Sequence, residues 1–280
     1  MIEERQKVLV TGARGMLGWA LTKKLGLEYQ LIGIDIEDAD ITDESQIKEE
    51  IFNIRPDVVI HCAAYTDVDN CEKNKILTHK VNSKGTENVA HACKLCQAKL
   101  LYISTDFVFD GSKKTPYTED DVPRPVNTYG RSKLEGEKQV QDLLENYLII
   151  RTSWLYGPHG QNFIDKITAP GREKLEVIND QIGSPTYTMD LAQAIGKLIK
   201  KDTIGILNVT NSGYCSWYNF AAAVLSIKKI DIPLMPITSD KLRTPARRPL
   251  YSVLSNDKFY QLMREKLRPW QEALAEYLGS

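Results

Sequence analysis

A short apolar run followed at once by three glycines most constrains how this chain can fold. Residues 8–11 read Val-Leu-Val-Thr, a β-branched run typical of a buried parallel strand. Gly12, Gly15 and Gly18 come next, and a helical pattern of leucines follows them. Gly12 would permit a tight turn, Gly15 a close approach of a pyrophosphate, and Gly18 close packing of the helix on the strand. The segment predicts a dinucleotide-binding unit in which a helix N-terminus faces the phosphates.

The choice of dinucleotide stays open between NADH and NADPH. The glycine spacing is G-x-x-G-x-x-G rather than the commoner G-x-G-x-x-G, so by itself it could be a plain structural turn. The next apolar run, 31–35, ends in Asp35, roughly 20 residues beyond the glycines, where a ribose-binding carboxylate belongs. Asp35 favours NAD because it accepts from a 2′-hydroxyl and repels a 2′-phosphate. Arg14 inside the loop could offset that repulsion and admit NADP.

A tyrosine and a lysine four residues apart supply the candidate chemistry. Tyr129 and Lys133 share one face of a predicted helix, about one turn apart. An ammonium beside a phenol favours the phenolate, so we expect the pKa of Tyr129 to fall toward neutrality. Thr105, at the carboxyl end of a predicted strand, could give a second hydrogen bond to the same oxygen. A surface helix face is the commoner explanation of the spacing alone, but beside a hydride carrier it predicts proton transfer at a carbonyl.

Strand and helix patterns alternate through the first half of the chain and predict an α/β fold. Apolar runs suggest further strands at 58–64, 100–105 and 147–152, and helical patterns lie at 43–54, 75–96 and after 126. This order indicates a Rossmann-type doubly wound parallel sheet. After residue 155 the alternation loosens, with strands expected at 175–180 and 204–210 and a helix at 191–199. We therefore expect a dinucleotide-binding domain at 1–155 and a smaller α/β substrate-binding part at 156–280, with the chain crossing between the two.

Composition narrows the class of protein. The chain has 280 residues and a formal net charge of −1, which argues against a general nucleic-acid binder. No apolar run approaches the roughly 20 residues that span a bilayer. Residues 1–7 lack the apolar stretch of a signal peptide, so we expect a cytoplasmic protein.

Cysteine and histidine spacing gives no metal site. Cys93 and Cys96 form a lone C-x-x-C, which could be a redox or metal half-site, but no second pair exists and the segment continues a helical pattern. We interpret it as structural. The four histidines have no zinc-ligand spacing, and we predict no metal.

Stretches from both halves of the chain together carry a family resemblance. They are residues 11–18, 55–60, 63–69, 104–109, 129–137, 151–156, 177–186 and 245–249. The chain resembles the extended short-chain dehydrogenase/reductases, and among them the dTDP-4-dehydrorhamnose reductase family. The glycine loop and the Y-x-x-x-K pattern are shared across the superfamily. The segments 66–69 and 180–181 and the Arg-Pro loop point to the narrower family.

The resemblance implies a reaction and a set of site residues. The reaction is NAD(P)H-dependent reduction of the C4 keto group of dTDP-4-dehydro-L-rhamnose to dTDP-L-rhamnose. Tyr129 would donate the proton, Lys133 would hold the nicotinamide ribose, and Thr105 would orient the carbonyl. The expected dinucleotide contacts are Gly12, Arg14, Gly15, Met16, Leu17, Asp35, Asp40, Ile41, Ala63, Ala64, Tyr65, Tyr129 and Lys133. The expected substrate contacts are Val68, Asp69, Thr105, Trp154, Arg247 and Arg248.

Several of these assignments have plainer alternatives. Trp154 could be ordinary core, and Thr66 and Asp69 could cap the following helix. The proline-rich basic loop that holds Arg247 and Arg248 could be a solvated loop rather than a phosphate site.

The family and its oligomeric state leave further alternatives. Another nucleotide-sugar epimerase or reductase of the superfamily remains possible, while a dehydratase would carry Asp-Glu where this chain has Asp106-Phe107. A non-catalytic NADP-binding regulator, like the regulatory subunit of methionine adenosyltransferase, is the other class. Some relatives share magnesium between subunits through a glutamate in the first helix. Ala20 stands at that position, so we predict no metal-linked dimer and leave monomer or homodimer open.

Overall fold

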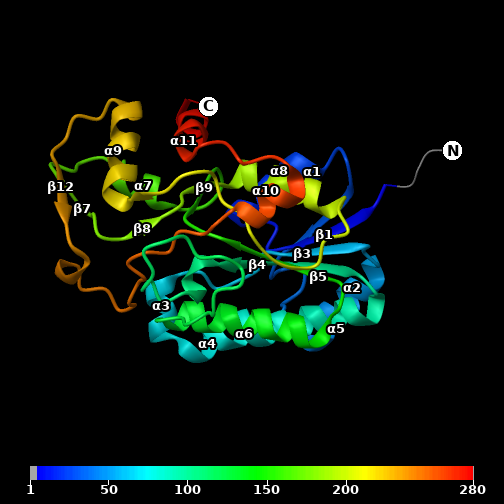
Figure 1. Cartoon of the computed structure of the whole chain (residues 1–280). Coiled ribbons are helices and arrows are strands. Elements are labelled where there is room, and N and C mark those ends of the chain that lie inside the picture. Colours follow the sequence, from blue (N-terminus) through cyan, green and yellow to red (C-terminus); the bar gives the residue numbers. More distant parts are fainter. Residues whose placement is uncertain (1–4, 280) are drawn as a thin grey trace.

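The computed structural model describes residues 5–279 and centres on a six-stranded parallel sheet (Figure 1). Its strands are β1 (Lys7–Thr11), β2 (Gln30–Ile34), β3 (Val58–His61), β4 (Lys99–Thr105), β5 (Tyr147–Thr152) and β10 (Gly205–Asn208). The order β10-β5-β4-β3-β1-β2 reverses direction between β1 and β3. Ligands of such sheets bind in the crevice outside the carboxyl ends of the strands at this reversal. The predicted doubly wound α/β fold is confirmed.

Helices cover both faces of the sheet, which is why its strands read as nearly continuous apolar runs (Figure 1). One face carries α1 (Met16–Leu25), α8 (Thr188–Ile199) and α10 (Asp257–Met263). The other carries α2 (Glu44–Ile54), α5 (Thr86–Cys96) and α6 (Thr128–Leu143). Asp43 caps α2 by accepting from the backbone N–H groups of Ser45 and Gln46.

The helical pattern expected at 75–96 is interrupted by a π-helical turn. The structure has α3 (Val68–Lys73), α4 (Lys75–His79), π-helical residues 80–85 and then α5. The turn contains Asn82, whose side chain accepts from the Tyr65 N–H at 2.7 Å and donates to the Tyr65 carbonyl at 2.9 Å. It therefore fixes the segment that follows β3, beside the crevice. Single π-turns of this kind are frequent at functional sites.

The later part of the chain builds a smaller lobe with its own apolar core. Its helices are α7 (Phe163–Ile167), α9 (Trp217–Lys228) and α11 (Trp270–Gly279). Its paired strands are β6 (Leu155–Tyr156) with β9 (Thr186–Tyr187), β7 (Leu175–Ile178) with β12 (Leu234–Ile237), and β8 (Ile182–Gly183) with β11 (Cys215–Ser216). Between them the chain returns to the main sheet as α8 and β10. The division at residue 155 stays a prediction.

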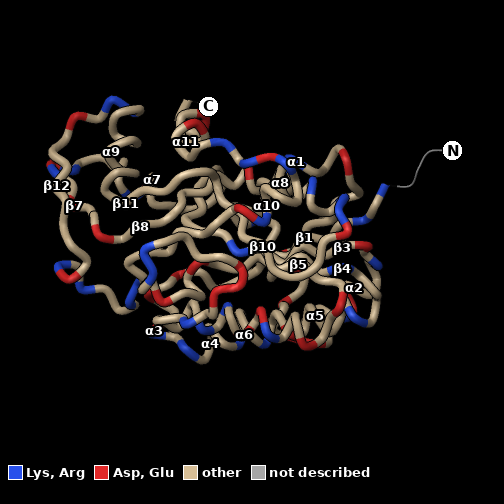
Figure 2. The backbone as a smooth tube through the Cα atoms, viewed as in Figure 1, with Lys and Arg blue, Asp and Glu red and all other residues tan. Residues whose placement is uncertain are grey.

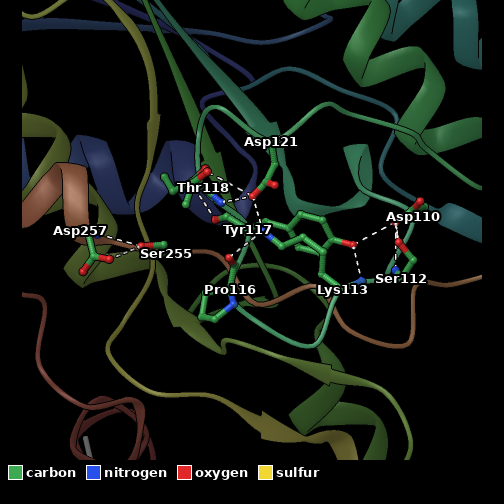
Figure 3. A network of polar contacts seen from close by, with 10 residues as sticks. Asp110, Ser112, Lys113, Pro116, Tyr117, Thr118, Asp121, Ser255 and Asp257 are labelled. Atoms are coloured by element: carbon green, nitrogen blue, oxygen red, sulfur yellow. Dashed lines mark hydrogen bonds and ion pairs between the residues drawn. The ribbon is translucent and has the colours of Figure 1, made fainter.

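The loop after β4 is locked to the C-terminal segment by a polar network (Figure 3). Tyr117 stacks on Phe109 with ring centroids 4.2 Å apart, and its hydroxyl donates to Asp110 at 3.0 Å. The Tyr117 carbonyl accepts from the Ser255 N–H at 2.7 Å, and its own N–H donates to the Val253 carbonyl at 2.8 Å. These hydrogen bonds join the segment around Tyr117 to the segment 253–255, which is distant in sequence.

Other sequence features have a plain structural outcome. Cys93 is buried in the core, and both it and Cys96 are free thiols. Basic and acidic residues are interspersed along α6 (Figure 2). Within residues 5–279, no helix is long and apolar enough to cross a bilayer. Residues 1–4, part of the segment in which no signal peptide is expected, lie outside the described residues.

Candidate active site

The glycine loop forms a tight cradle between β1 and α1. Gly12 has a φ of +67°, and a Cβ there would lie 2.7 Å from the Ala63 nitrogen. A Cβ on Gly18 would lie 2.2 Å from the Gly12 carbonyl oxygen. α1 begins after Gly15 without a side-chain cap, so its first N–H groups are available to an anion. The cradle fits a dinucleotide diphosphate.

A buried histidine is linked by hydrogen bonds to residues next to this cradle. The His61 ring lies 2.7 Å from the Thr11 hydroxyl through Nδ1 and 3.1 Å from the Thr86 hydroxyl through Nε2. The Ala63 N–H donates to that Thr11 hydroxyl at 3.3 Å. Burial, with a smaller contribution from the Lys133 charge, lowers the pKa of His61 to about 3, so the ring is neutral. The histidine spacing in the sequence bears only on metal ligation, so no sequence signal indicated this role of His61.

The acidic end of β2 surrounds Arg14 with carboxylates. The Arg14 N–H donates to Asp35 at 2.9 Å. Its guanidinium pairs with Glu37 at 2.7 Å and lies 3.8 Å from Asp38. Much of the Arg14 charge is thus compensated locally, which weakens it as a partner for a 2′-phosphate.

The start of α6 is held from two sides, and this positions the tyrosine and lysine. Asn127 caps the helix by accepting from the Gly130 N–H at 2.8 Å. Glu72 accepts from the Thr128 N–H at 2.6 Å and from its hydroxyl at 2.8 Å. Tyr129 then follows in the first turn with Lys133 one turn later, and both line the crevice.

Burial decides the protonation of the catalytic candidates. It raises the pKa of Tyr129 above its ordinary value, opposed by a side-chain hydrogen bond with Thr105. The expected fall in the pKa of Tyr129 is therefore wrong. The Lys133 Nζ lies 4.1 Å from the ring centroid of Tyr102, and burial lowers the pKa of Lys133 itself to about 7 while Glu137 opposes the shift. A lysine that is partly neutral cannot stabilise a phenolate as a full ammonium would.

A cavity of about 690 Å³ joins the glycine loop, the catalytic candidates and the smaller lobe. Fourteen predicted residues line it: Gly12, Gly15, Met16, Leu17, Asp35, Asp40, Ile41, Ala63, Ala64, Val68, Thr105, Tyr129, Lys133 and Trp154. Arg14, Tyr65, Asp69, Arg247 and Arg248 lie outside its wall. Lining residues that sequence analysis did not assign include Asp106, Phe107, Ser153, Gln161 and Trp217. The position of Asp106 directly after Thr105 could have indicated that Asp106 lies at the cavity, whereas no sequence feature indicated this for Trp217.

Asp69 and Arg248 bind each other. Two Arg248 nitrogens lie 3.1 and 2.8 Å from the Asp69 carboxylate, which also accepts from the Ala246 N–H at 3.1 Å. The α3 cap is Asp67, so neither Thr66 nor Asp69 has the capping role considered as an alternative. The pair joins α3 to the proline-rich loop, and the Arg247 side chain remains exposed.

Asp106 is a buried acid in the wall of the cavity. Only 2% of it is exposed, and it accepts from the Thr105 hydroxyl at 3.0 Å. Burial raises the pKa of Asp106 to about 7, although hydrogen bonds to Ser252 and Thr105 oppose the shift. Near neutral pH this carboxyl is therefore partly protonated beside Thr105.

The fold and the site define a nicotinamide-dependent oxidoreductase of the short-chain dehydrogenase/reductase type. The dinucleotide cradle and the Thr105, Tyr129 and Lys133 side chains share one cavity in a Rossmann sheet. The family model described as the RmlD substrate binding domain matches residues 6–280, and the chain belongs to this family.

Known relatives resemble the chain over nearly its full length. The spore coat polysaccharide biosynthesis protein SpsK of Bacillus subtilis is 39% identical, with 97% of this chain and 96% of that protein covered. The dTDP-4-dehydrorhamnose reductase of Mycolicibacterium smegmatis is 38% identical, with 98% and 86% covered. The crystal structure of dTDP-4-dehydrorhamnose reductase from Bacillus anthracis in complex with NADP is 41% identical, covers 98% of both chains and has a TM-score of 0.94.

Proposed function

We propose that this protein reduces the C4 keto group of dTDP-4-dehydro-L-rhamnose to give dTDP-L-rhamnose, with NADH or NADPH as reductant. The observation that carries the proposal is the convergence of Thr105, Tyr129 and Lys133 on the cavity that contains the glycine cradle. Relatives that bear the name dTDP-4-dehydrorhamnose reductase support the substrate.

The cradle side of the cavity is proposed to hold the dinucleotide. The N–H groups at the start of α1, around Gly15, Met16 and Leu17, would bind its diphosphate. Asp35 would accept from the adenosine ribose. The other proposed contacts are Gly12, Arg14, Asp40, Ile41, Ala63, Ala64 and Tyr65, with Tyr129 and Lys133 at the nicotinamide end. When bound, the reduced nicotinamide supplies the hydride.

Tyr129 is the proposed proton donor to the developing alkoxide. Its raised pKa keeps the phenol protonated at neutral pH, as a donor requires. Thr105 hydrogen-bonds to Tyr129 and would hold the carbonyl oxygen near the phenol. Lys133, behind them on α6, would hold the nicotinamide ribose. Its lowered pKa would rise again beside a diphosphate, because nearby negative charge favours the ammonium.

The smaller lobe and the proline-rich loop are proposed to hold the nucleotide sugar. Val68 and Trp154 line the cavity. Arg247, whose side chain is exposed, would bind the diphosphate of the substrate. The Asp69–Arg248 pair would act on the substrate by holding this loop in place.

The decisive experiment follows the loss of reduced-nicotinamide absorbance when the purified protein meets dTDP-4-dehydro-L-rhamnose. We expect turnover by the wild type and a kcat about 10²–10⁴-fold lower for Tyr129→Phe, which should still bind the cofactor. The two nicotinamides are compared in the same assay. Cofactor binding without turnover would instead favour a regulatory protein. Turnover only with another dTDP-linked 4-keto sugar would correct the substrate.

A further inference from the structure

Trp154 has a backbone conformation that side chains rarely adopt. Its φ is +46°, immediately after β5 and the following residue, Ser153. For a bulky residue this left-handed region is an outlier that persists only where the surrounding structure imposes it. Trp154 also lines the cavity. Trp154 is thus both the residue with the unusual backbone conformation and a proposed contact of the substrate.

A second tryptophan holds the Trp154 ring from one side. The indoles of Trp154 and Trp217 are stacked with centroids 3.5 Å apart and an interplanar angle of 4°. Phe163 packs against Trp217 with ring centroids 4.5 Å apart. Trp217 is the first residue of α9, whose N-cap Ser216 accepts from the Asn219 N–H at 3.1 Å. The supporting ring therefore stands on a capped helix end.

The segment that follows β7 holds the same ring from another side. A Cβ on Gly183 would lie 2.4 Å from Cε2 of Trp154, so this glycine admits the indole only because it has no side chain. Gly183 pairs with Cys215 across β8 and β11, next to Trp217 in sequence. The backbone of Trp154 is fixed as well, since its carbonyl accepts from the Thr186 N–H at 3.2 Å.

We propose that Trp217 and Gly183 are positioning residues that hold the Trp154 indole as a rigid aromatic wall for the sugar of the substrate. The inference rests on the proposed function and extends it to residues for which sequence analysis gave no role. An indole face suits the apolar face and methyl group of a 6-deoxy sugar. A hydroxymethyl group there would lose hydrogen bonds to water.

Gly183 gives the clearest test because it is not among the cavity-lining residues, and it acts on the substrate only through Trp154. We expect Gly183→Ala to raise the KM for the nucleotide sugar about ten-fold, with kcat reduced less and the affinity for the dinucleotide unchanged. Trp217→Leu should have the same signature, and Trp217→Phe, which retains an aromatic ring, should recover most of the loss.

Circular dichroism of the indole bands gives an independent readout of the stack. Two parallel indoles at this distance should give an exciton couplet in the wild type. The couplet should be absent in Trp217→Leu, altered in Gly183→Ala, and retained in the control Trp19→Leu, whose indole stacks on His159 elsewhere.

The outcomes separate the inference from the proposed function. A KM within two-fold of wild type in Gly183→Ala, with an altered couplet, would overturn the inference. A wild type without turnover would overturn the proposed function. In that case, titration with dTDP-L-rhamnose replaces the kinetic assay, and equal affinities of wild type and Gly183→Ala would overturn the inference as well.

Discussion

Glu137 on α6 and Arg151 on β5 form a buried ion pair, and Glu137 also acts on the charge of the catalytic candidate Lys133; we predict that the fold depends on this pair. Both side chains are about 1% exposed. Arg151 donates from Nε and Nη2 to the Glu137 carboxylate at 2.9 and 2.6 Å, and the Ser104 hydroxyl donates to the same carboxylate at 2.5 Å. Glu137→Gln removes the charge that compensates Arg151 but keeps the volume of the side chain.

The expected loss is large because a buried charge would be left unpaired. Arg151 already has one nitrogen, Nη1, without a partner among the described residues. Removing one member of a buried pair costs about 3–5 kcal/mol. Total stabilities are about 5–15 kcal/mol, so Glu137→Gln should lose about a fifth or more of the free energy of unfolding. At typical denaturant sensitivities this lowers the urea midpoint by roughly 1 M or more.

The assay is urea unfolding followed by far-ultraviolet circular dichroism at neutral pH. The matched control is Glu135→Gln on the same helix, because Glu135 pairs with His79 on the surface and should contribute no more than about 1 kcal/mol. The double variant Glu137→Met, Arg151→Met should regain more than half of the loss, since no unpaired charge remains. A loss for Glu137→Gln no larger than that of the control would refute the reasoning.

Three further predictions test the site. Tyr129→Phe should lower kcat by about 10²–10⁴-fold while the dissociation constant of the dinucleotide stays unchanged, as fluorescence titration would show. His61 has a folded pKa of about 3 against 6.5 unfolded, so only the unfolded state binds its proton between these values and stability is lost as pH falls. This loss should reach about 2 kcal/mol at pH 5, and the urea-unfolding difference between wild type and His61→Gln should shrink by that amount between pH 7.5 and 5. Asp35→Asn should shift the ratio of kcat/KM for NADPH over NADH upward by about ten-fold, because a repulsive charge beside a 2′-phosphate is removed. An unchanged ratio would exclude Asp35 from cofactor choice.

Local pattern was enough to predict the alternating strands and helices in the first half of the chain and the doubly wound class of the sheet. The glycine loop, the capping residue Asp43 and the apolar runs of the strands depend on near neighbours in sequence, so they can be read from it. The placement of Thr105, Tyr129 and Lys133 at one cavity also followed, because the carboxyl ends of parallel strands meet at one edge.

Tertiary packing alone decided the electrostatics and the long-range pairs. The pKa of Tyr129 rises because burial outweighs its hydrogen bond with Thr105, and burial depends on every element packed around the residue. Asp69 and Arg248 are 179 residues apart, so no local pattern joins them. The same holds for Trp154 and Trp217, which lie far apart in sequence and stack only in the folded chain. Sequence by itself determined the fold class and the kinds of side chains at the crevice. The folded chain determined the protonation of these side chains and the stacking of Trp154 on Trp217, because solvent exclusion and contacts between distant segments exist only in the tertiary structure.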